Sequence, residues 1–409
     1  MSIFQFHGPL SLESPLYKGR ATDLEKLIRW CQGEIQHYGI LYGARQCGKT
    51  SLLLRLDQYL ASSAAVCWVD FEYLSDGSPA RAFTVLAQKI AETLKMQPPS
   101  LDIHDAMSFA DNLCQMLSMS SVPKLVLMIE EMGALQKNTR FAIANGLRAI
   151  FNDRVRPSRR ILSKFMVIIA GNIEVYELAS TEVSPIGNIC QKHYLDDLEQ
   201  ENAVALIEEG MSTLGVEEGQ AKTIAMHIYE LTHGYPYLTQ RLGNAIEMEF
   251  EEYTSLDHDT LERGISKFLL GDNALIKHIR RSLNDQDLEV PSRALILGNV
   301  PFDRRDEGMA RLELIGLARN DDNTWRVRNQ LFQRILEHWL HEQDQQQEPL
   351  GMGLVRIFDS HAVPVGAGIL VHGNRVVTCG HVVASALDIT IDERPEKEIA
   401  FDFPLLAPV

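Results

Sequence analysis

The chain has 409 residues, 45% of them hydrophobic and 23% charged, which is ordinary for soluble globular protein but too long for one core, so we expect two or three domains. The net charge of −16 argues against broad nucleic-acid binding, and no apolar run approaches the roughly 18–20 residues of a membrane helix. The start of the chain lacks the charged and apolar regions of a signal peptide. The six cysteines are scattered without a C-x-x-C pair, which argues against zinc and favours reduced thiols in a cytoplasm.

The first informative segment of the chain is a glycine-rich loop. Residues 1–16 are irregular, and residues 23–30 have helical spacing. The apolar run 39–42 then leads into residues 43–50, which complete the phosphate-binding pattern G-x-x-x-x-G-K-[ST]. A helical stretch, residues 51–56, follows directly. The predicted nucleotide-binding residues of the loop are Gly43, Ala44, Arg45, Gln46, Cys47, Gly48, Lys49, Thr50 and Ser51.

A loop of this kind works between a buried strand and the N-terminus of a helix. There, backbone N–H groups and the helix dipole hold the phosphates. Lys49 would reach the β- and γ-phosphates, and the Thr50 hydroxyl would bind Mg²⁺. The alternative is a chance glycine-rich turn, which the flanking strand and helix disfavour. The sequence therefore predicts ATP and Mg²⁺ as cofactors.

Short apolar runs alternate with helical stretches up to about residue 171. The expected strands are residues 65–71, 124–129 and 165–171, and the expected helices are residues 80–96, 105–119 and 139–151. Parallel strands buried on both faces have this continuous apolar character, whereas strands with one wet face alternate. The pattern predicts an α/β fold, a P-loop NTPase parallel sheet covered by helices on both faces.

Two acids end the strand at residues 124–129. ATP hydrolysis needs carboxylates at the end of a neighbouring strand, one for Mg²⁺ and one to orient the attacking water. We expect Glu130 to help hold Mg²⁺ and Glu131 to be the catalytic residue that polarises water, together with Lys49. Glu130 stands where an aspartate is usual, and its longer arm could contact the ion through a water. Alternatively, the two acids could begin a solvated helix.

The pattern changes after residue 195. Residues 196–283 are wholly helical, and residues 284–340 read as helices followed by a small hairpin with strands at 316–319 and 324–327, which suggests a winged helix or an arbitrary α+β extension. A polar, Gln-rich stretch then precedes short strands with glycine turns. The predicted domains are 1–195 (nucleotide-binding), 196–283 (helical lid), 284–340 (winged helix), 341–351 (linker) and 352–409 (all-β).

Segments in matching order give the first domains a family resemblance. They are Ser-Pro-Leu-Tyr-Lys-Gly-Arg at 14–20, the loop 43–51, the strand that ends at Glu131, and Thr-His-Gly-Tyr-Pro-Tyr-Leu at 232–238. Together they resemble the AAA-like NTPase domain of bacterial STAND proteins, signal-transduction ATPases with numerous domains. The resemblance covers roughly residues 4–340.

The resemblance implies further site residues. It puts Gly19 and Arg20 near the nucleotide base, makes Asn172 a sensor at the end of the fourth strand, and lays Gly234 and Pro236 of the lid over the nucleotide. Each has an ordinary alternative. The arginine could cap a surface helix, the asparagine could be a turn residue, and the proline could simply begin a helix.

A local basic cluster runs against the acidic balance of the chain. It consists of Arg154, Arg156, Arg159 and Arg160. One of these side chains could be an arginine finger that reaches a neighbouring protomer. A solvated basic loop is the favoured interpretation.

The last domain resembles the first half of a trypsin-like serine protease, an incomplete all-β barrel. Strands at 353–357, 366–371 and 375–378 lead into Thr-Cys-Gly-His, and the resemblance makes His381 the catalytic histidine. Asp388, Asp392 and Asp402 follow the histidine and are candidates for the acid of the triad. No Gly-Asp-Ser-Gly nucleophile segment follows within the chain. We expect protease activity only in a longer protein: either this sequence is a fragment of one, which is the favoured interpretation, or the tail is degenerate.

The sequence thus predicts an ATP-dependent STAND signalling switch with a serine-protease effector. By resemblance, activation means self-oligomerisation after an unknown protein trigger, with a protein as substrate of the protease domain, in bacterial defence. No membrane or nucleic-acid partner is expected. The main alternative is a mechanical or initiator-type AAA ATPase with a nucleic-acid-binding winged helix, and a third is a non-catalytic nucleotide-binding scaffold.

Overall fold

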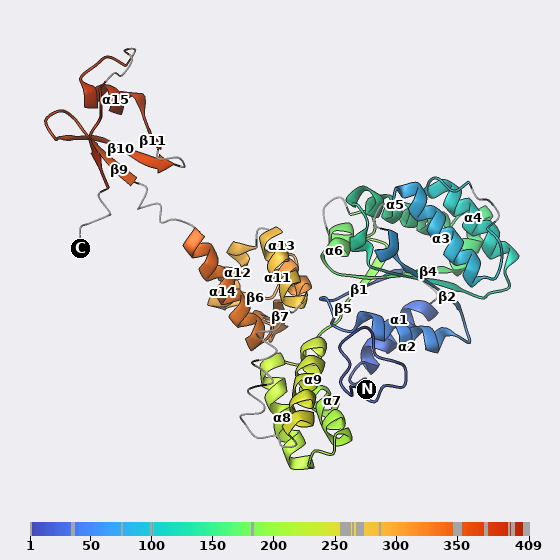
Figure 1. Ribbon diagram of the computed structural model, residues 1–409. Coiled ribbons are helices and arrows are strands. Elements are labelled where there is room, and N and C mark those ends of the chain that lie inside the picture. Colours follow the sequence, from blue (N-terminus) through green and yellow to red (C-terminus); the bar gives the residue numbers. More distant parts are fainter. Residues whose placement is uncertain are drawn as a thin grey trace. The chain divides into compact units, whose positions relative to one another are not determined.

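The structure is a computed structural model of two compact units, Met1–Leu336 and Glu337–Val409 (Figure 1). It describes residues 2–33, 37–74, 77–98, 100, 102–180, 184–253, 263, 266, 274–285, 288–346, 354–371, 375–391, 393 and 397–403. Among the described helices, none combines the length and apolarity that crossing a bilayer requires.

A five-stranded parallel sheet is the centre of the first unit. Its order is β2 (Ala65–Asp70), β3 (Leu125–Glu130), β4 (Phe165–Gly171), β1 (Tyr38–Tyr42) and β5 (Cys190–Tyr194). The strands β1, β3 and β4 are buried almost throughout, as their continuous apolar sequences predict. The predicted α/β fold with a parallel sheet is confirmed.

Strand order differs from the sequence-based expectation in one respect. The acidic strand β3 was expected beside the strand that enters the glycine-rich loop, but β4 pairs with both and lies between them. Sequence periodicity carries no information on strand order, because every buried parallel strand has the same apolar pattern. The strand β5 was not predicted, since its Cys-Gln-Lys-His-Tyr sequence has the polar, partly exposed character of an edge strand.

Helices cover both faces of this sheet. Figure 1 shows α1 and α2 on one face and α3, α4 and α5 on the other. Their bounds are α1 Ala21–Gln32, α2 Lys49–Leu60, α3 Pro79–Thr93, α4 Ala106–Met119, α5 Lys137–Asp153 and α6 Ile173–Ser180, with short 3-10 helices η1 Phe71–Leu74, η2 Met132–Ala134 and η3 Pro157–Lys164. The three long helices expected from their spacing are therefore present.

The rest of the first unit is mostly helical. It comprises α7 Gln200–Thr213, α8 Glu218–Thr232, α9 Pro236–Tyr253, α11 Ala274–Asp285, α12 Glu289–Leu297 and α13 Glu307–Ile315, and the helix α14 Gln330–Gln346 leads into the second unit. A small antiparallel sheet of order β6 (Val300–Pro301), β8 (Thr324–Val327), β7 (Ala318–Asp321) accompanies α11–α13. The predicted hairpin is thus present, and a winged helix stays a prediction.

Two details of this region depart from the expected element bounds. The hairpin turn is the pair Asp322 and Asn323, both with positive φ (47° and 60°). The strand β7 begins at Ala318 and not at the expected residue 316. Helix α14 continues through Gln346 and so includes residues 341–346 of the expected linker. Glutamine and glutamate are good helix formers, which lets a polar segment extend a helix that a core has already started.

The second unit contains an open antiparallel sheet. Its order is β11 (Arg375–Thr378), β10 (Pro364–Val371), β9 (Leu354–Phe358) and β12 (Phe401–Asp402), and helix α15 (Gly380–Leu387) packs on it. The small core consists of Val355, Ile357, Val382 and Ala386. These strands do not close a barrel among the described residues, and the turn expected at residues 373–374 lies outside them.

Candidate nucleotide site at the edge of the parallel sheet

The glycine-rich loop lies between β1 and α2, as its pattern requires. Gly48 stands at the N-cap of α2 with φ of 98°, a left-handed conformation that side chains other than glycine rarely adopt. The Gly43 amide donates to the carbonyl of Gly171 at the end of β4 (3.2 Å). Within the loop, Arg45 and Gln46 are exposed, and Ala44 and Cys47 are buried. The loop thus begins the first long helix at the carboxyl edge of the sheet.

The side chains of Lys49 and Thr50 bond to different elements at this edge: Lys49 to the loop itself and Thr50 to the end of β3. The Lys49 ammonium donates to the carbonyls of Gly43 (2.9 Å) and Ala44 (2.8 Å), which keeps its charge over the loop. The Thr50 hydroxyl donates to Glu130 Oε1 at the end of β3 (2.7 Å). These oxygen atoms are the hard ligands that Mg²⁺ accepts, so the donor set fits the predicted ion.

Burial sets the protonation of Glu130. Removal from water raises the pKa of its carboxyl, while the Thr50 hydroxyl and the Lys49 charge act in the opposite direction. The charges of Glu131 and Asp70 add to the increase. A cation bound at this edge would oppose the effect of burial and favour the ionised form of the Glu130 carboxyl.

Glu131 and Asn172 directly follow the inner strands β3 and β4. Glu131 is exposed and has φ of 50°, an uncommon conformation for a residue with a side chain. Asn172 follows β4, and its carbonyl accepts from the amides of Val175 and Tyr176 at the start of α6. Because β4 lies between β1 and β3, Asn172 follows the strand that separates the loop from Glu131. The predicted sensor and water-orienting residues stay predictions.

Arg20 braces the loop from the side of α1. It is the N-cap residue of that helix, but its buried side chain makes no capping bond. Instead its guanidinium donates to the carbonyls of Asp196 (2.7 Å) and Cys47 (3.2 Å). Gly19, directly before it, has φ of 70°. Arg20 thus reaches the loop, and contact of either residue with a nucleotide base stays a prediction.

Ser51 has a structural partner that the sequence did not reveal. Its hydroxyl accepts from the Leu10 amide (3.0 Å). One turn later, Arg55 donates to the Ser11 carbonyl (2.7 Å) and its guanidinium stacks on the Tyr17 ring, 3.4 Å from the centroid. These contacts fix the N-terminal segment on α2, so the Ser51 hydroxyl serves packing while its amide remains part of the loop.

Tyr235 of the predicted lid touches the loop. Its buried hydroxyl donates to the carbonyl of Arg45. The neighbouring Gly234 has no room for a side chain, because a Cβ there would lie 2.0 Å from the Leu198 carbonyl oxygen. Pro236 is the first residue of α9, a position where proline is well tolerated. Sequence reasoning chose the glycine and the proline and missed the tyrosine between them.

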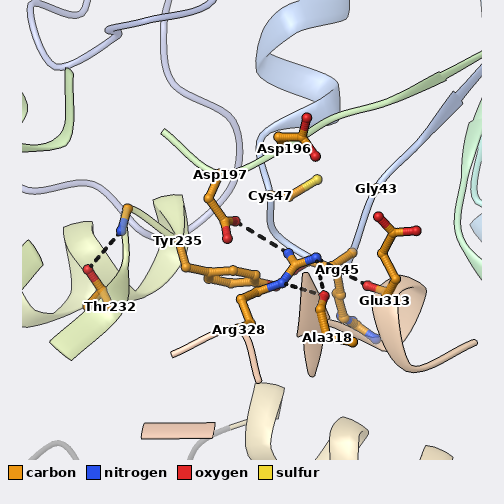
Figure 2. A network of polar contacts seen from close by, with 12 residues as sticks. Gly43, Arg45, Cys47, Asp196, Asp197, Thr232, Tyr235, Glu313, Ala318 and Arg328 are labelled. Atoms are coloured by element: carbon orange, nitrogen blue, oxygen red, sulfur yellow. Dashed lines mark hydrogen bonds and ion pairs between the residues drawn. The ribbon is translucent and has the colours of Figure 1, made fainter. Parts of the chain in front are cut away.

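A buried arginine joins this lid contact to the small sheet. Figure 2 shows the Arg328 guanidinium by the Tyr235 ring, whose centroid is 5.4 Å away, and pointing to Asp197. Arg328 lies 3.3 Å from the Asp197 carboxylate and donates to the Ala318 carbonyl (3.1 Å) and the Glu313 carbonyl (3.3 Å). Burial raises the pKa of Asp197, and the Arg328 charge opposes that shift. No sequence signal marks this arginine, which follows the hairpin.

The basic cluster makes contacts within the chain. Arg154 lies over the Tyr38 ring, 4.6 Å from its centroid, and donates to the Phe165 carbonyl. Arg156 pairs with Asp153 at 3.2 Å. Further contacts join Arg159 to Asp111 and Asp153, and Arg160 is exposed. The arginine-finger assignment stays a prediction.

His381 is not part of an assembled triad among the described residues. It is exposed in the first turn of α15 and forms no hydrogen bond or ion pair with a carboxylate among the described residues. Asp402 instead pairs with Arg356 (2.6 Å), and Asp388 ends α15. The third candidate acid, Asp392, lies outside the described residues. No metal-binding cluster of His, Cys, Asp and Glu occurs in the described part of the chain.

Comparison with known proteins places this geometry in a family. The AAA-like domain profile matches residues 5–338. A Walker-type ATPase of Pyrococcus abyssi has the same fold over 82% of this chain and 99% of its own, with a TM-score of 0.58 and 14% identity. A search of curated protein sequences finds no match.

Two further solved structures match with lower scores. The ORC2 protein of Aeropyrum pernix, in ADPNP and ADP complexes, has a TM-score of 0.48 at 12% identity, covering 84% of this chain and 98% of its own. The RuvB Holliday junction branch migration motor of Thermotoga maritima has a TM-score of 0.42 at 15% identity, covering 79% and 96%.

Proposed function

The chain belongs to the AAA-like domain family over residues 5–338, and from that premise we propose that it is an ATP-hydrolysing molecular switch. The observation that carries the proposal is the hydrogen bond from the Tyr235 hydroxyl to the Arg45 carbonyl. It joins the helical segment after the sheet to the loop that would hold the phosphates. A nucleotide that changes the loop therefore changes a contact on which the lid depends.

In this proposal, the loop amides and Lys49 bind the triphosphate, and Thr50 and Glu130 hold Mg²⁺. The ion supplies neutralisation of the charge on the phosphate oxygens. Glu131, which directly follows β3, orients the attacking water. Asn172 senses the terminal phosphate from the end of β4.

The finer proposal is a STAND-type signalling switch. Nucleotide state would govern self-oligomerisation of the first unit, after a protein trigger, and the second unit would be a serine-protease effector that carries His381 and acts on a protein in bacterial defence. Sequence resemblance supports this version. The Tyr235–Arg328–Asp197 network supports the coupling step, since it links loop, lid and small sheet.

Hydrogen exchange with and without nucleotide tests the switch. We expect ATP with Mg²⁺ to change amide protection in α9 and in the α13–β7 segment of the full chain. Tyr235→Phe removes only the donor to Arg45, a bond worth about 1 kcal/mol, and should reduce this change. Tyr237→Phe, on the same helix, is the matched control. Identical exchange in α9 with and without ATP would rule out the switch.

An initiator-type ATPase is the second candidate. The feature that favours it is the small sheet beside helices α11–α13, whose hairpin carries Arg319 and the exposed Arg326. Against it stand the net charge of −16 and the pairing of Arg319 with Asp321 (3.3 Å). Duplex DNA binding at physiological salt separates the two functions, because submicromolar, salt-sensitive affinity supports the initiator.

A further inference from the structure

An open pocket of about 640 Å³ lies away from the glycine-rich loop. Its charged walls come from separate elements: Arg148 from α5, Lys192 from β5, and Arg304 and Arg305 from the segment before α13. Tyr194 of β5 also lines it. No residue of the loop 43–51 does, so this basic pocket is distinct from the nucleotide site.

The charge of the basic pocket is unusual for so acidic a chain. Among the described residues, its lining includes four cationic side chains and no carboxylate. Two of the four are paired with carboxylates, since Arg304 binds Glu313 (2.6 Å) and Arg305 binds Asp303 (2.8 Å). The charges of the other two are therefore the ones that face a ligand uncompensated.

Arg148 and Lys192 are those two cations. Arg148 makes no hydrogen bond or ion pair within the described part of the chain. Lys192 is exposed and, among the described residues, donates only to neutral oxygens, the Ala179 carbonyl (2.7 Å) and the Ser180 hydroxyl (3.1 Å). Two unpaired positive charges on one concave surface attract an anion of more than one charge.

The remaining wall contains aromatic side chains. The Arg304 guanidinium stacks on the Tyr194 ring, 3.7 Å from its centroid, and the Tyr176 hydroxyl donates to the Arg304 carbonyl (3.4 Å). Burial raises the pKa of Tyr194, so its hydroxyl stays neutral and can donate. A flat surface of this kind suits a ring or other apolar part of a small molecule.

We propose that the basic pocket binds a small phosphorylated ligand, with its phosphate groups on Arg148 and Lys192 and the remainder against Tyr194 and Arg304. The volume lies within the roughly 300–1,000 Å³ range of small-molecule sites. Phosphate matches the planar guanidinium and the ammonium better than a single carboxylate does. A concave site on a chain of charge −16 favours a small ligand over a nucleic-acid backbone.

Calorimetry on the full chain tests the proposal. The probes are inorganic pyrophosphate and AMP, titrated into the Lys49→Ala variant, in which the loop is disabled. We expect saturable binding with a Kd of about 1 mM or tighter. Arg148→Gln and Lys192→Gln should each weaken it roughly tenfold, as the loss of one charge-assisted contact predicts. Arg160→Gln, an exposed arginine outside the pocket, should leave it unchanged.

The outcomes are decisive in either direction. Absence of saturable binding of both probes overturns the proposal, and so does binding that the two pocket variants leave intact. If duplex DNA binds instead and the same variants weaken DNA binding, the pocket binds backbone phosphates and the small-ligand assignment is wrong. In the chain with Lys49 present, the pocket variants should remove one of two pyrophosphate sites, which guards against misfolding of Lys49→Ala. None of these results depends on the proposed switch.

Discussion

The two regions in which the sequence predicts catalytic residues differ in how many parts of the chain meet there. At the sheet edge that carries the glycine-rich loop, α2, β3 and the predicted lid converge, and Thr50 reaches Glu130 across 80 positions of sequence while Tyr235 reaches Arg45 across 190. Around His381, the described residues provide one short helix on an open sheet. The glycine-rich loop and the residue after it therefore bond to residues far away in the sequence. The helix that carries His381 brings no such long-range partner to this histidine among the described residues.

Burial explains the contrast. The strands β1, β3 and β4 lie inside the first unit, so their ends are held in fixed positions. In the second unit, the core is limited to a few side chains, and Ile369, Val377 and Phe401 are among the large hydrophobic residues that stay exposed. A site needs rigid supporting elements to hold side chains within reach of one another.

The largest expected effect comes from the loop lysine. Lys49→Ala should weaken ATP binding on the order of 1,000-fold, because two charge-assisted contacts to phosphate are lost, while the fold stays intact. Isothermal calorimetry measures the affinity, and circular dichroism checks the fold. Lys89→Ala, which removes an exposed ion pair with Glu92, is the control. Retained micromolar affinity would contradict the assignment of this edge.

A smaller effect is expected at the end of β3. Glu131→Gln should slow phosphate release about 100-fold and leave ATP affinity nearly unchanged, since it removes the group that orients water without touching the loop. Steady-state phosphate release and calorimetry give the two readouts. Glu72→Gln, an acid that follows the edge strand β2, is the matched control. Unchanged release in the Glu131 variant favours a non-catalytic scaffold.

A weaker, pH-dependent effect on stability is expected from His233, at the end of α8. Burial, with the Arg319 charge adding to it, lowers the pKa of His233 below its ordinary 6.5. The unfolded chain then binds more protons than the folded chain, so this histidine destabilises the protein as the pH falls through 6.5. His233→Asn, which tolerates the left-handed φ of 47°, should flatten the loss of stability between about pH 7 and 5. Denaturant unfolding at each pH measures this slope, and a slope equal to that of the unchanged protein would count against it.

The smallest effect is expected in the second unit. His381→Ala should change neither ATP affinity nor stability by more than about 0.5 kcal/mol, because the side chain is exposed. We also expect the 409-residue chain to show no peptidase activity that depends on this histidine. A cleavage product that this variant abolishes would show that the second unit assembles a site, and the contrast between the two regions would fail.

Much of the fold follows from local pattern. The strands β1 to β4 and the long helices α3, α4 and α5 have the expected apolar runs and spacing. The edge strand β5 was not predicted, because a strand with polar residues resembles a loop in sequence. Helix α14 extends into the supposed linker for a related reason, since glutamine-rich sequence carries no apolar signal but continues a helix readily.

The site was predicted unevenly. The loop residues and the pair Glu130 and Glu131 could be proposed from the sequence because their chemistry depends on contiguous residues, and their roles stay predictions. Tyr235 and Arg328 were missed, since an isolated tyrosine or arginine has no periodicity and its role arises from a distant partner. Ser51 had a loop assignment that did not anticipate its bond to Leu10.

The sequence by itself determined a strand, a phosphate-binding loop and a helix in direct succession, because hydrogen bonding, backbone φ and hydrophobic period act over a few neighbouring residues. Only the tertiary structure decided that β4 separates the loop from the acids, that Tyr235 contacts the loop, and that Arg328 pairs with Asp197, 131 positions away. Such contacts depend on strand order and on the packing of whole elements, which no local pattern specifies.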